Sequence, residues 1–459
     1  MNNKHVVVTM LTALCLTACG GGGSNSGGSS TPITVASTTT EAIPLVPSSI
    51  SFVSALPASI GLKGMGGVGV QETSTITFKV LDLSGKPLAN QLVDFSLNTT
   101  VGGLTLIASS GTTAANGTVT TIVQSGIIAT SVRVTATLRG VSPAISTQSD
   151  QLVISTGVSA QDGFSLSIVT RNPEAWNIDG VTDVVTARLS DHFHNPVPDG
   201  TAVYFTTSGG SIQPSCITTG GACSVNWTSQ NPRPTTVTGA IQSGRAVILA
   251  YAVGEEAFLD TNGNGVADAG EFTDTSEAFR DDNESGSKDP TETFIDFNSD
   301  GVFNGPDGRY NGVLQGAAYT GAPRSKHIYS NTTIVMASSA ASITNSCGAA
   351  SIAVGRGSST ACSIFVSDTN GNTMPVGTTV GFTLATSVQG TTVVAAATTL
   401  TELTMTAASY TFPNSASPVG SSIGATIADP SLTTSARGTF TVTVTSPGGI
   451  ITTRNYTVN

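Results

Sequence analysis

Three stretches of the chain share one pattern of strand, polar turn and strand, and this repeat restricts the possible folds more than any other feature. The turns begin at Asp82, Asp191 and Asp368. Apolar residues alternate with polar ones on both sides of each turn, which predicts β-strands with one buried face. Each unit is therefore predicted to be an antiparallel hairpin. Only 10% of the residues are charged and glycine is abundant, which is typical of all-β secreted proteins and not of helical enzymes.

Further short strands with turn signals follow in each copy, for example residues 132–138 in the first and 440–444 in the third. Such spacing predicts immunoglobulin-like β-sandwiches of about 100 residues each. The stretches Asp82–Phe95 and Asn195–Phe205 resemble the group 1 bacterial immunoglobulin-like domains of the invasin and intimin type. This resemblance implies β-sandwiches used in surface stalks and adhesins, and it implies no catalytic residues.

The spacing of the copies predicts three tandem sandwiches and a long insertion in the second. Asp82 and Asp191 are 109 residues apart, whereas Asp191 and Asp368 are 177 apart, an excess of 68. The excess follows the strand at 246–253, and a strand pattern resumes near 327–336. The predicted domains are residues 49–157, 158–337 and 338–459, with the insertion at 254–325.

The insertion carries almost all of the negative charge of the protein. Between Glu255 and Asp307 there are fifteen carboxylates against only Arg280 and Lys288, a local net charge of −13 in a chain whose total is −11. The other residues therefore sum to +2. No basic face is available to neutralise phosphates, so a nucleic-acid partner is not expected.

Three windows inside the insertion place oxygen-bearing side chains at positions 1, 3, 5, 9 and 12, with Gly at position 6. The first is Asp260, Asn262, Asn264, Asp268 and Glu271; the second is Asp281, Asn283, Ser285, Asp289 and Glu292; the third is Asp296, Asn298, Asp300, Asn304 and Asp307. At position 7, Val266 and Val302 are expected to supply backbone carbonyls. This is the spacing with which a twelve-residue loop wraps a hard cation, so the sequence predicts Ca²⁺ as the cofactor.

The quality of the three loops differs, and two other interpretations compete. Affinity is expected to fall from the first loop to the third and then to the second, because Asp307 is shorter than Glu and Ser285 replaces an amide or carboxylate. A paired EF-hand or dockerin, with cohesin as partner, needs flanking amphipathic helices, and the residues after Glu271 show no sustained helical period. A disordered acidic loop would not explain Gly at position 6 three times.

The N-terminus resembles the signal of bacterial lipoproteins. An apolar run at residues 6–16 is too short to span a bilayer and ends in Leu16-Thr17-Ala18-Cys19. The resemblance implies a signal peptide at 1–18, acylation of Cys19 and attachment to the membrane through this lipid. No Asp follows Cys19, which by the same resemblance favours the outer membrane. Residues 19–48, rich in Gly, Ser and Thr, are expected to be a flexible tether.

Four further cysteines form two close pairs, Cys216 with Cys223 and Cys347 with Cys362. In an exported protein such pairs indicate disulfides. Three connectivities are possible, and the large sequence gap between the pairs favours the local one. A Cys347–Cys362 bond would contribute about 3 kcal/mol to the free energy of unfolding in the chain-entropy model.

Other candidate chemistry is sparse. His192 and His194 could form a metal pair, but they lie in a repeated turn, and Trp176 and Trp227 could stack on sugars but are more often core residues. No catalytic constellation can be singled out, so an enzyme is not expected.

We expect an outer-membrane-anchored lipoprotein that acts as a calcium-stiffened adhesion or interaction module toward an unknown protein or glycan at the cell surface. Whether it faces outward or into the periplasm is open. The alternatives are a carbohydrate-binding or scaffolding accessory of a surface enzyme system, for which Trp176 or Trp227 would bind sugar, and a structural spacer.

Overall fold

The computed structural model describes residues 46–64, 71–235, 243–387, 403–432 and 436–459. The predicted signal peptide, the predicted lipidation site Cys19 and most of the predicted tether lie outside these residues. Within them the regular secondary structure is β-strands and three short 3₁₀ turns, Val101–Gly103, Gln161–Gly163 and Ala317–Tyr319, with no α-helix. The all-β prediction is confirmed. No helix in the described ranges could cross a membrane.

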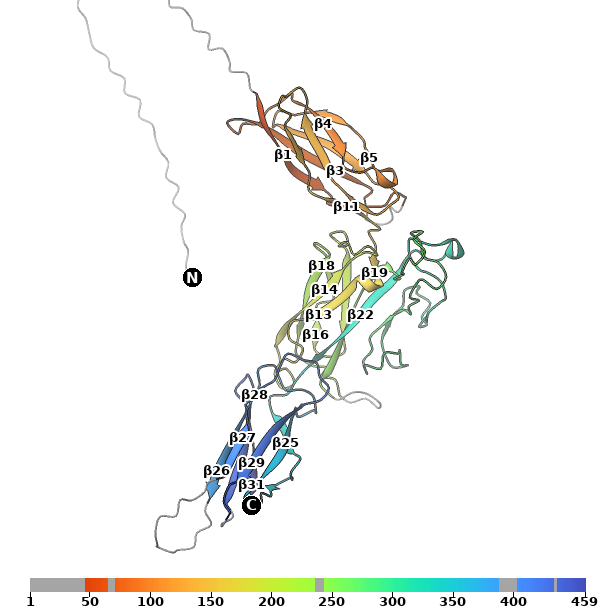
Figure 1. The fold of residues 1–459 in the computed structure, drawn as a ribbon. Helices are drawn as coiled ribbons and strands as arrows, with labels where there is room; N and C mark the ends of the chain where they lie inside the picture. Colours follow the sequence, from red (N-terminus) through yellow and green to blue (C-terminus); the bar gives the residue numbers. More distant parts are fainter. Residues whose placement is uncertain (1–45, 65–70, 236–242, 388–402, 433–435) are drawn as a thin grey trace, which may run out of the picture. The chain divides into compact units, whose positions relative to one another are not determined.

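The strands between Pro47 and Ser155 enclose the first hydrophobic core (Figure 1). They are β1 (Pro47–Leu56), β2 (Ser59–Gly61), β3 (Thr73–Asp82), β4 (Leu92–Leu97), β5 (Thr105–Leu106), β6 (Ser110–Thr112), β7 (Thr118–Gln124), β8 (Thr130–Val132), β9 (Val134–Leu138), β10 (Ser146–Gln148) and β11 (Leu152–Ser155). One sheet has the order β1-β3-β7-β5, the facing sheet has β10-β9-β4-β6, and β2-β11-β8 form a third small sheet. Phe78 of the first sheet stacks on Phe95 of the second at a centroid distance of 5.9 Å.

The second core, around the fully buried Trp227, lies between two further sheets. Their strands are β12 (Ser159–Ala160), β13 (Phe164–Ile168), β14 (Thr182–Leu189), β15 (Ala202–Thr207), β16 (Ser211–Ile212), β17 (Ser215–Ile217), β18 (Ala222–Thr228), β19 (Arg245–Glu255) and β22 (Lys326–Val335). One sheet has the order β12-β19-β15-β17 with β22 added on β19, and the other has β13-β14-β18-β16.

The third core is built in the same way from the strands after residue 340. They are β23 (Ala341–Asn345), β24 (Ser351–Ile352), β25 (Ser358–Asp368), β26 (Thr379–Ser387), β27 (Thr404–Ala407), β28 (Tyr410–Thr411), β29 (Ser421–Asp429), β30 (Arg437–Thr445) and β31 (Ile451–Val458). The two sheets have the orders β23-β25-β29-β27 and β24-β31-β30-β26-β28.

The repeated turn joins strands of opposite sheets in every copy: β3 to β4, β14 to β15 and β25 to β26. The predicted antiparallel hairpin is therefore wrong. Apolar alternation reports which face of a strand is buried, but it does not report the hydrogen-bonding partner of that strand. Two facing sheets bury the same core, so a crossover between sheets has the same sequence pattern as a hairpin.

The aspartate that opens each repeated turn organises the backbone around it. Asp368 is fully buried, and its Oδ1 accepts the N–H groups of Asn370 and Asn372 at 2.8 Å each. Its Oδ2 accepts the N–H of Ser338 at 3.2 Å, and Ser338 lies on the chain that enters the third sandwich. One side chain therefore holds both a turn and the linker before it.

Asp368→Ala is expected to lower the free energy of unfolding of the third sandwich by about 3 kcal/mol or more. It leaves three N–H groups without an acceptor, at a cost of about 1–3 kcal/mol for each one that is buried. Asp82→Ala is the matched control, because Asp82 Oδ1 accepts only groups of its own turn: the N–H groups of Ser84 and Lys86, at 2.8 Å each, and the hydroxyl of Ser84, at 2.7 Å. Scanning calorimetry measures both losses. Equal losses would mean that the bond to Ser338 contributes nothing.

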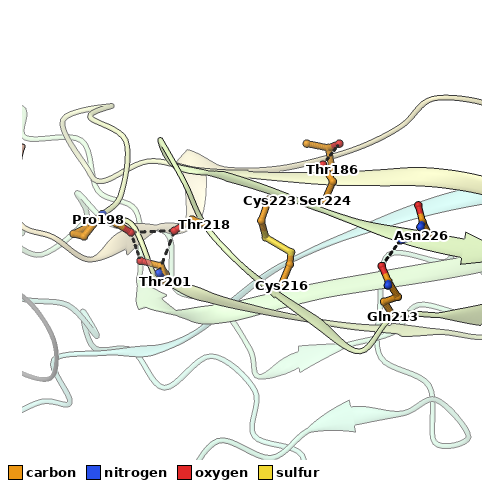
Figure 2. Close-up of a disulfide and its surroundings, with 9 residues drawn as sticks. All are labelled: Thr186, Pro198, Thr201, Gln213, Cys216, Thr218, Cys223, Ser224 and Asn226. Atoms are coloured by element: carbon orange, nitrogen blue, oxygen red, sulfur yellow. Dashed lines mark hydrogen bonds between the residues drawn. A yellow bond between two sulfur atoms is a disulfide. The ribbon is translucent and has the colours of Figure 1, made fainter. Parts of the chain in front are cut away.

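Both predicted disulfides are present. Cys216 on β17 is bonded to Cys223 on β18, and because these strands belong to different sheets the bond ties the two sheets together (Figure 2). Beside it, the hydroxyls of Thr201 and Thr218 both donate to the carbonyl of Pro198, at 2.8 and 3.0 Å. The second bond, Cys347–Cys362, connects the segment after β23 to β25.

The chain between β19 and β22, residues 256–325, is called the acidic insertion below. β19 and β22 pair antiparallel along their length, with Gly254 opposite Lys326, so the insertion leaves and rejoins the sheet at neighbouring positions. It contains only two short strands, β20 (Ala278–Phe279) and β21 (Phe294–Ile295). It folds back beside β22 (Figure 1). Asn331 of β22 donates to the carbonyl of Phe279 in the insertion at 3.0 Å.

Candidate metal centre

A small apolar cluster and buried carboxylates give the acidic insertion its structure. Phe258, Ala267 and Tyr310 are buried together, with other aromatic rings packed against them. Glu256 is fully buried and accepts the N–H of Asn311 at 2.9 Å. The segment is therefore not a disordered acidic loop, and no α-helix flanks the predicted loops within the described residues, as an EF-hand would require.

All three predicted loops begin with the same turn. In each, the two carboxylate oxygens of the aspartate at position 1 accept the N–H groups of positions 5 and 6. The distances are 3.2 and 2.8 Å at Asp260, 2.9 and 2.8 Å at Asp281, and 3.2 and 2.7 Å at Asp296. The amide oxygen at position 3 accepts the N–H of position 5 at 3.0 Å in every loop. Three separate sequences thus fold into one local geometry.

Positions 4 and 6 have a positive φ in every loop. At position 6 the values are 80° for Gly265, 78° for Gly286 and 80° for Gly301. At position 4 they are 76° for Gly263, 56° for Glu284 and 61° for Ser299. Glycine adopts this conformation at little steric cost, which is the reason it recurs at position 6.

A glutamate closes the first and second loops from position 12. Glu271 accepts the N–H groups of Thr261 and Asp268, at 3.0 and 3.1 Å, one on each oxygen. Glu292 in the second loop also accepts two N–H groups, that of Asn283 at position 3, at 3.2 Å, and that of position 9, at 3.0 Å. Each closing carboxylate is thereby aimed into its own loop.

The third loop is closed by a residue from outside its window. Glu277 accepts the N–H of Phe297 at position 2, at 2.8 Å, and the N–H of Asn304 at position 9, at 3.0 Å. Asp307, the predicted position-12 ligand, points elsewhere: its Oδ1 accepts the N–H of Arg309 at 2.9 Å. The structure therefore places Glu277 in the closing role. The sequence signal that could have found it is the Glu-x-Phe-x-Asp pattern, which precedes all three loops.

Hydrogen bonds hold key loop carboxylates in the ionised form. The N–H of Gly265 lowers the pKa of Asp260, and the hydroxyl of Thr261 lowers the pKa of Glu271. Both residues are partly exposed, so the hydrogen bonds outweigh the small cost of desolvation. Ionised carboxylates are the form that binds hard cations.

The side-chain amides of the loops are the other groups that could ligate a cation. Asn262 and Asn264 donate their Nδ2 groups to one oxygen of Asp268, at 3.0 and 2.7 Å. Rotation of each amide by half a turn would present oxygen in place of nitrogen. Among the residues that the structure describes, no group of three His, Cys, Asp or Glu side chains is arranged to hold a metal ion. A cation bound in these loops would be ligated by carboxylate, amide and backbone carbonyl oxygens together.

A buried carboxylate at the end of β19 joins the insertion to the sandwich. Oε2 of Glu255 accepts the N–H of Val313 at 2.9 Å and the hydroxyl of Tyr310 at 3.4 Å. Oε1 has no hydrogen-bond partner among the described residues. Burial raises the pKa of Glu255 to about 7.

In the presence of a chelator, the stability of the wild type relative to Glu255→Gln is expected to fall as the pH rises. The folded-state pKa, about 7, lies above the ordinary value of 4.5. The stabilising contribution is therefore fully present below pH 4.5 and lost as the pH rises through 7. The difference amounts to about 3 kcal/mol at most. Urea unfolding of both proteins at about pH 5 and about pH 8 measures it, and a pH-independent difference would contradict the assignment.

The minor predicted candidates lie in structural positions. Trp227 is fully buried and donates Nε1–H to the carbonyl of Gly209 at 2.8 Å, so it cannot present a face to a sugar. Trp176 packs against the second core. His192 stacks on Phe258 at a centroid distance of 4.0 Å, and its neighbour in the turn, His194, is exposed.

No protein-family model and no curated protein sequence matches the chain. Among solved structures it is similar to the Escherichia coli adhesin FdeC, at 15% identity, covering 90% of this chain and 99% of that one, with a TM-score of 0.28. It is also similar to invasin, a bacterial integrin-binding protein, at 16% identity, covering 90% of this chain and 60% of that one, with a TM-score of 0.27. It is similar as well to InvD of Yersinia pseudotuberculosis, at 14% identity, covering 89% of this chain and 96% of that one, with a TM-score of 0.28. At these values function has to be inferred from the residues of this chain.

Proposed function

We propose that the protein is a lipid-anchored surface lipoprotein whose sandwiches form an adhesion or interaction module, stiffened by Ca²⁺ bound in the acidic insertion. The observation that carries the proposal is the geometry shared by the three loops: position 1 accepts the N–H groups of positions 5 and 6 in each, and a glutamate accepts the N–H of position 9 in each. Extracellular loops of this kind bind Ca²⁺ at about 10⁻⁴ to 10⁻³ M, which suits surroundings where the ion is millimolar.

A link from the second loop to the third sandwich supports the stiffening role. Arg245 donates to both carboxylate oxygens of Glu284, at 2.7 and 2.8 Å, and Glu284 occupies position 4 of the second loop. The same guanidinium donates to the carbonyl of Ala416 at 2.8 Å. Its side chain is only 5% exposed. A bidentate pair fixes geometry, so an ion that orders the loop would also order this contact.

The contact around Arg245 belongs to a joint rich in hydrogen bonds. Asn172 is fully buried and donates Nδ2 to the carbonyls of Met374 and Pro413, at 2.7 and 3.0 Å. Its Oδ1 accepts the N–H of Ser415 at 3.0 Å. Breaking these contacts would leave buried polar groups without partners, so they oppose separation of the two segments. A defined joint is what a module needs to present a binding surface away from a membrane.

Intact cells expressing the full chain test anchoring, exposure and calcium dependence together. Added protease is expected to degrade the protein on wild-type cells, and to do so faster in chelator than in millimolar Ca²⁺. The same cells are expected to adhere to epithelial cells or matrix only when Ca²⁺ is present. Cys19→Ala should release the protein from the membrane fraction. Protection from protease on intact cells would contradict surface exposure, and adherence equal to that of cells lacking the protein would contradict the adhesion role.

A further inference from the structure

Asp274 lies outside the three windows, but it makes the same hydrogen bonds as the aspartate at position 1 of each loop. Asp274 accepts the N–H of Asp307 at Oδ1, 3.1 Å, and the N–H of Gly308 at Oδ2, 2.5 Å. These are the contacts that position 1 makes with positions 5 and 6 in the three loops. Gly308 has a φ of 75°, as the position-6 glycines do. Asp307 and Gly308 thus correspond to positions 5 and 6, although they lie more than thirty residues after Asp274.

The buried Glu256 makes the same hydrogen bonds as the glutamates that close the first and third loops. Oε1 of Glu256 accepts the N–H of Thr275, directly after Asp274, at 2.8 Å. Oε2 accepts the N–H of Asn311 at 2.9 Å. Counted from Asp274 and Asp307, these residues are positions 2 and 9, the two positions that Glu271 and Glu277 bind in the first and third loops.

The second half of this arrangement repeats the third loop in sequence as well as in geometry. Residues 307–311, Asp-Gly-Arg-Tyr-Asn, align with residues 300–304, Asp-Gly-Val-Phe-Asn. Asp307 accepts the N–H of Arg309 at 2.9 Å and the side-chain amide of Asn311 at 3.2 Å. The corresponding bonds to Asp300 in the third loop are 2.8 and 3.0 Å.

Besides being discontinuous, this arrangement differs from the three loops because a positively charged side chain of the protein lies beside it. The Lys326 ammonium donates to Oε1 of Glu256 at 2.9 Å and also to the carbonyl of Thr275. Its side chain is 11% exposed, and that of Glu256 is fully buried. A buried carboxylate needs such a partner, since an unpaired charge in this position would be strongly destabilising.

We propose that the acidic insertion contains a fourth, discontinuous cation loop, formed by Asp274, Asp307, Asn311 and Glu256, in which the Lys326 ammonium replaces Ca²⁺. The interpretation of these residues as a cation loop rests on the proposed calcium function of the other three. An ammonium supplies a compact charge and three donors, so this split loop stays closed at any calcium concentration. It holds the end of the insertion beside the first residue of β22, whether or not the other loops are filled.

Counting bound Ca²⁺ in Lys326→Ala tests the proposal. Equilibrium dialysis of the full chain against a few millimolar Ca²⁺ gives the number of ions per molecule, and Lys326→Ala is expected to bind one more ion than the wild type. Lys326→Arg keeps the charge and should bind the wild-type number. Lys63→Ala is the matched control: Lys63 is an exposed lysine of the first sandwich, so its loss removes one positive charge and leaves the acidic insertion intact.

The ion counts of the wild type and of Lys326→Ala test the split loop and the proposed calcium function independently. If the wild type binds no Ca²⁺ but Lys326→Ala binds one, the split loop is supported and the other three loops are not. If both bind the same number, the ammonium does not occupy a cation position and the proposal is overturned. Where Lys326→Ala unfolds in chelator, recovery of its melting temperature by Ca²⁺ to the wild-type value supports the proposal, and failure to recover overturns it.

Discussion

Chelation of Ca²⁺ is expected to lower the melting temperature of the purified chain and to open the three loops, residues 260–271 and 281–304, to protease. The first three loops concentrate ionised carboxylates in a segment with a net charge of −13 between Glu255 and Asp307. Without a cation these charges repel one another, so folding of the segment is coupled to binding. With a dissociation constant of about 10⁻⁴ M and about 2 mM Ca²⁺, each loop would contribute about 2 kcal/mol to the free energy of unfolding.

The double variant Asp260→Ala with Asp296→Ala should reproduce the chelator effect in the presence of Ca²⁺. It removes the carboxylates that organise positions 5 and 6 of the first and third loops. Asp150→Asn, an exposed residue outside the insertion, controls for the loss of negative charge. Calorimetric titration that detects no Ca²⁺ uptake by the wild type would contradict the calcium function outright.

Much of this fold follows from local sequence pattern. Alternation of apolar residues identifies the buried faces of β3, β14 and β25, because an apolar side chain tends to be buried whichever strand packs against it. Glycine at position 6 marks a backbone with positive φ wherever it occurs. The two disulfides follow from close spacing in sequence, because a short loop keeps two cysteines near each other.

Features that depend on distant residues do not follow from such patterns. Both a hairpin and a crossover bury one face of each strand, so the sequence could not assign β3 and β4 to different sheets. The twelve-residue pattern assigns Asp307 to the third loop, because it considers only residues that follow one another in the sequence. The closing glutamate of that loop, Glu277, lies before the second loop and reaches Phe297 only in the folded chain.

Glu277→Gln is expected to remove the ion of the third loop, whereas Asp307→Asn is expected to leave it bound. Glu277 is 6% exposed and directs both oxygens at N–H groups of this loop, so it is placed to supply two of the ligand oxygens. Loss of a carboxylate from a site with few charges weakens Ca²⁺ binding by about tenfold or more. Asp307 makes its contacts in the split loop, and asparagine there retains the Oδ1 acceptor for Arg309.

Equilibrium dialysis gives the ion count for each variant, and hydrogen exchange of residues 296–304 shows which loop has lost its ion. At about 0.2 mM Ca²⁺, Glu277→Gln should leave the third loop mostly empty and exchange faster in this range than the wild type, with the first loop unchanged. Glutamine keeps the size of glutamate and one acceptor, so a change in count reflects the lost charge and not a collapsed core. If Asp307→Asn loses the ion and Glu277→Gln keeps it, the third loop closes through its own twelfth residue, and the assignment of Glu277 is wrong.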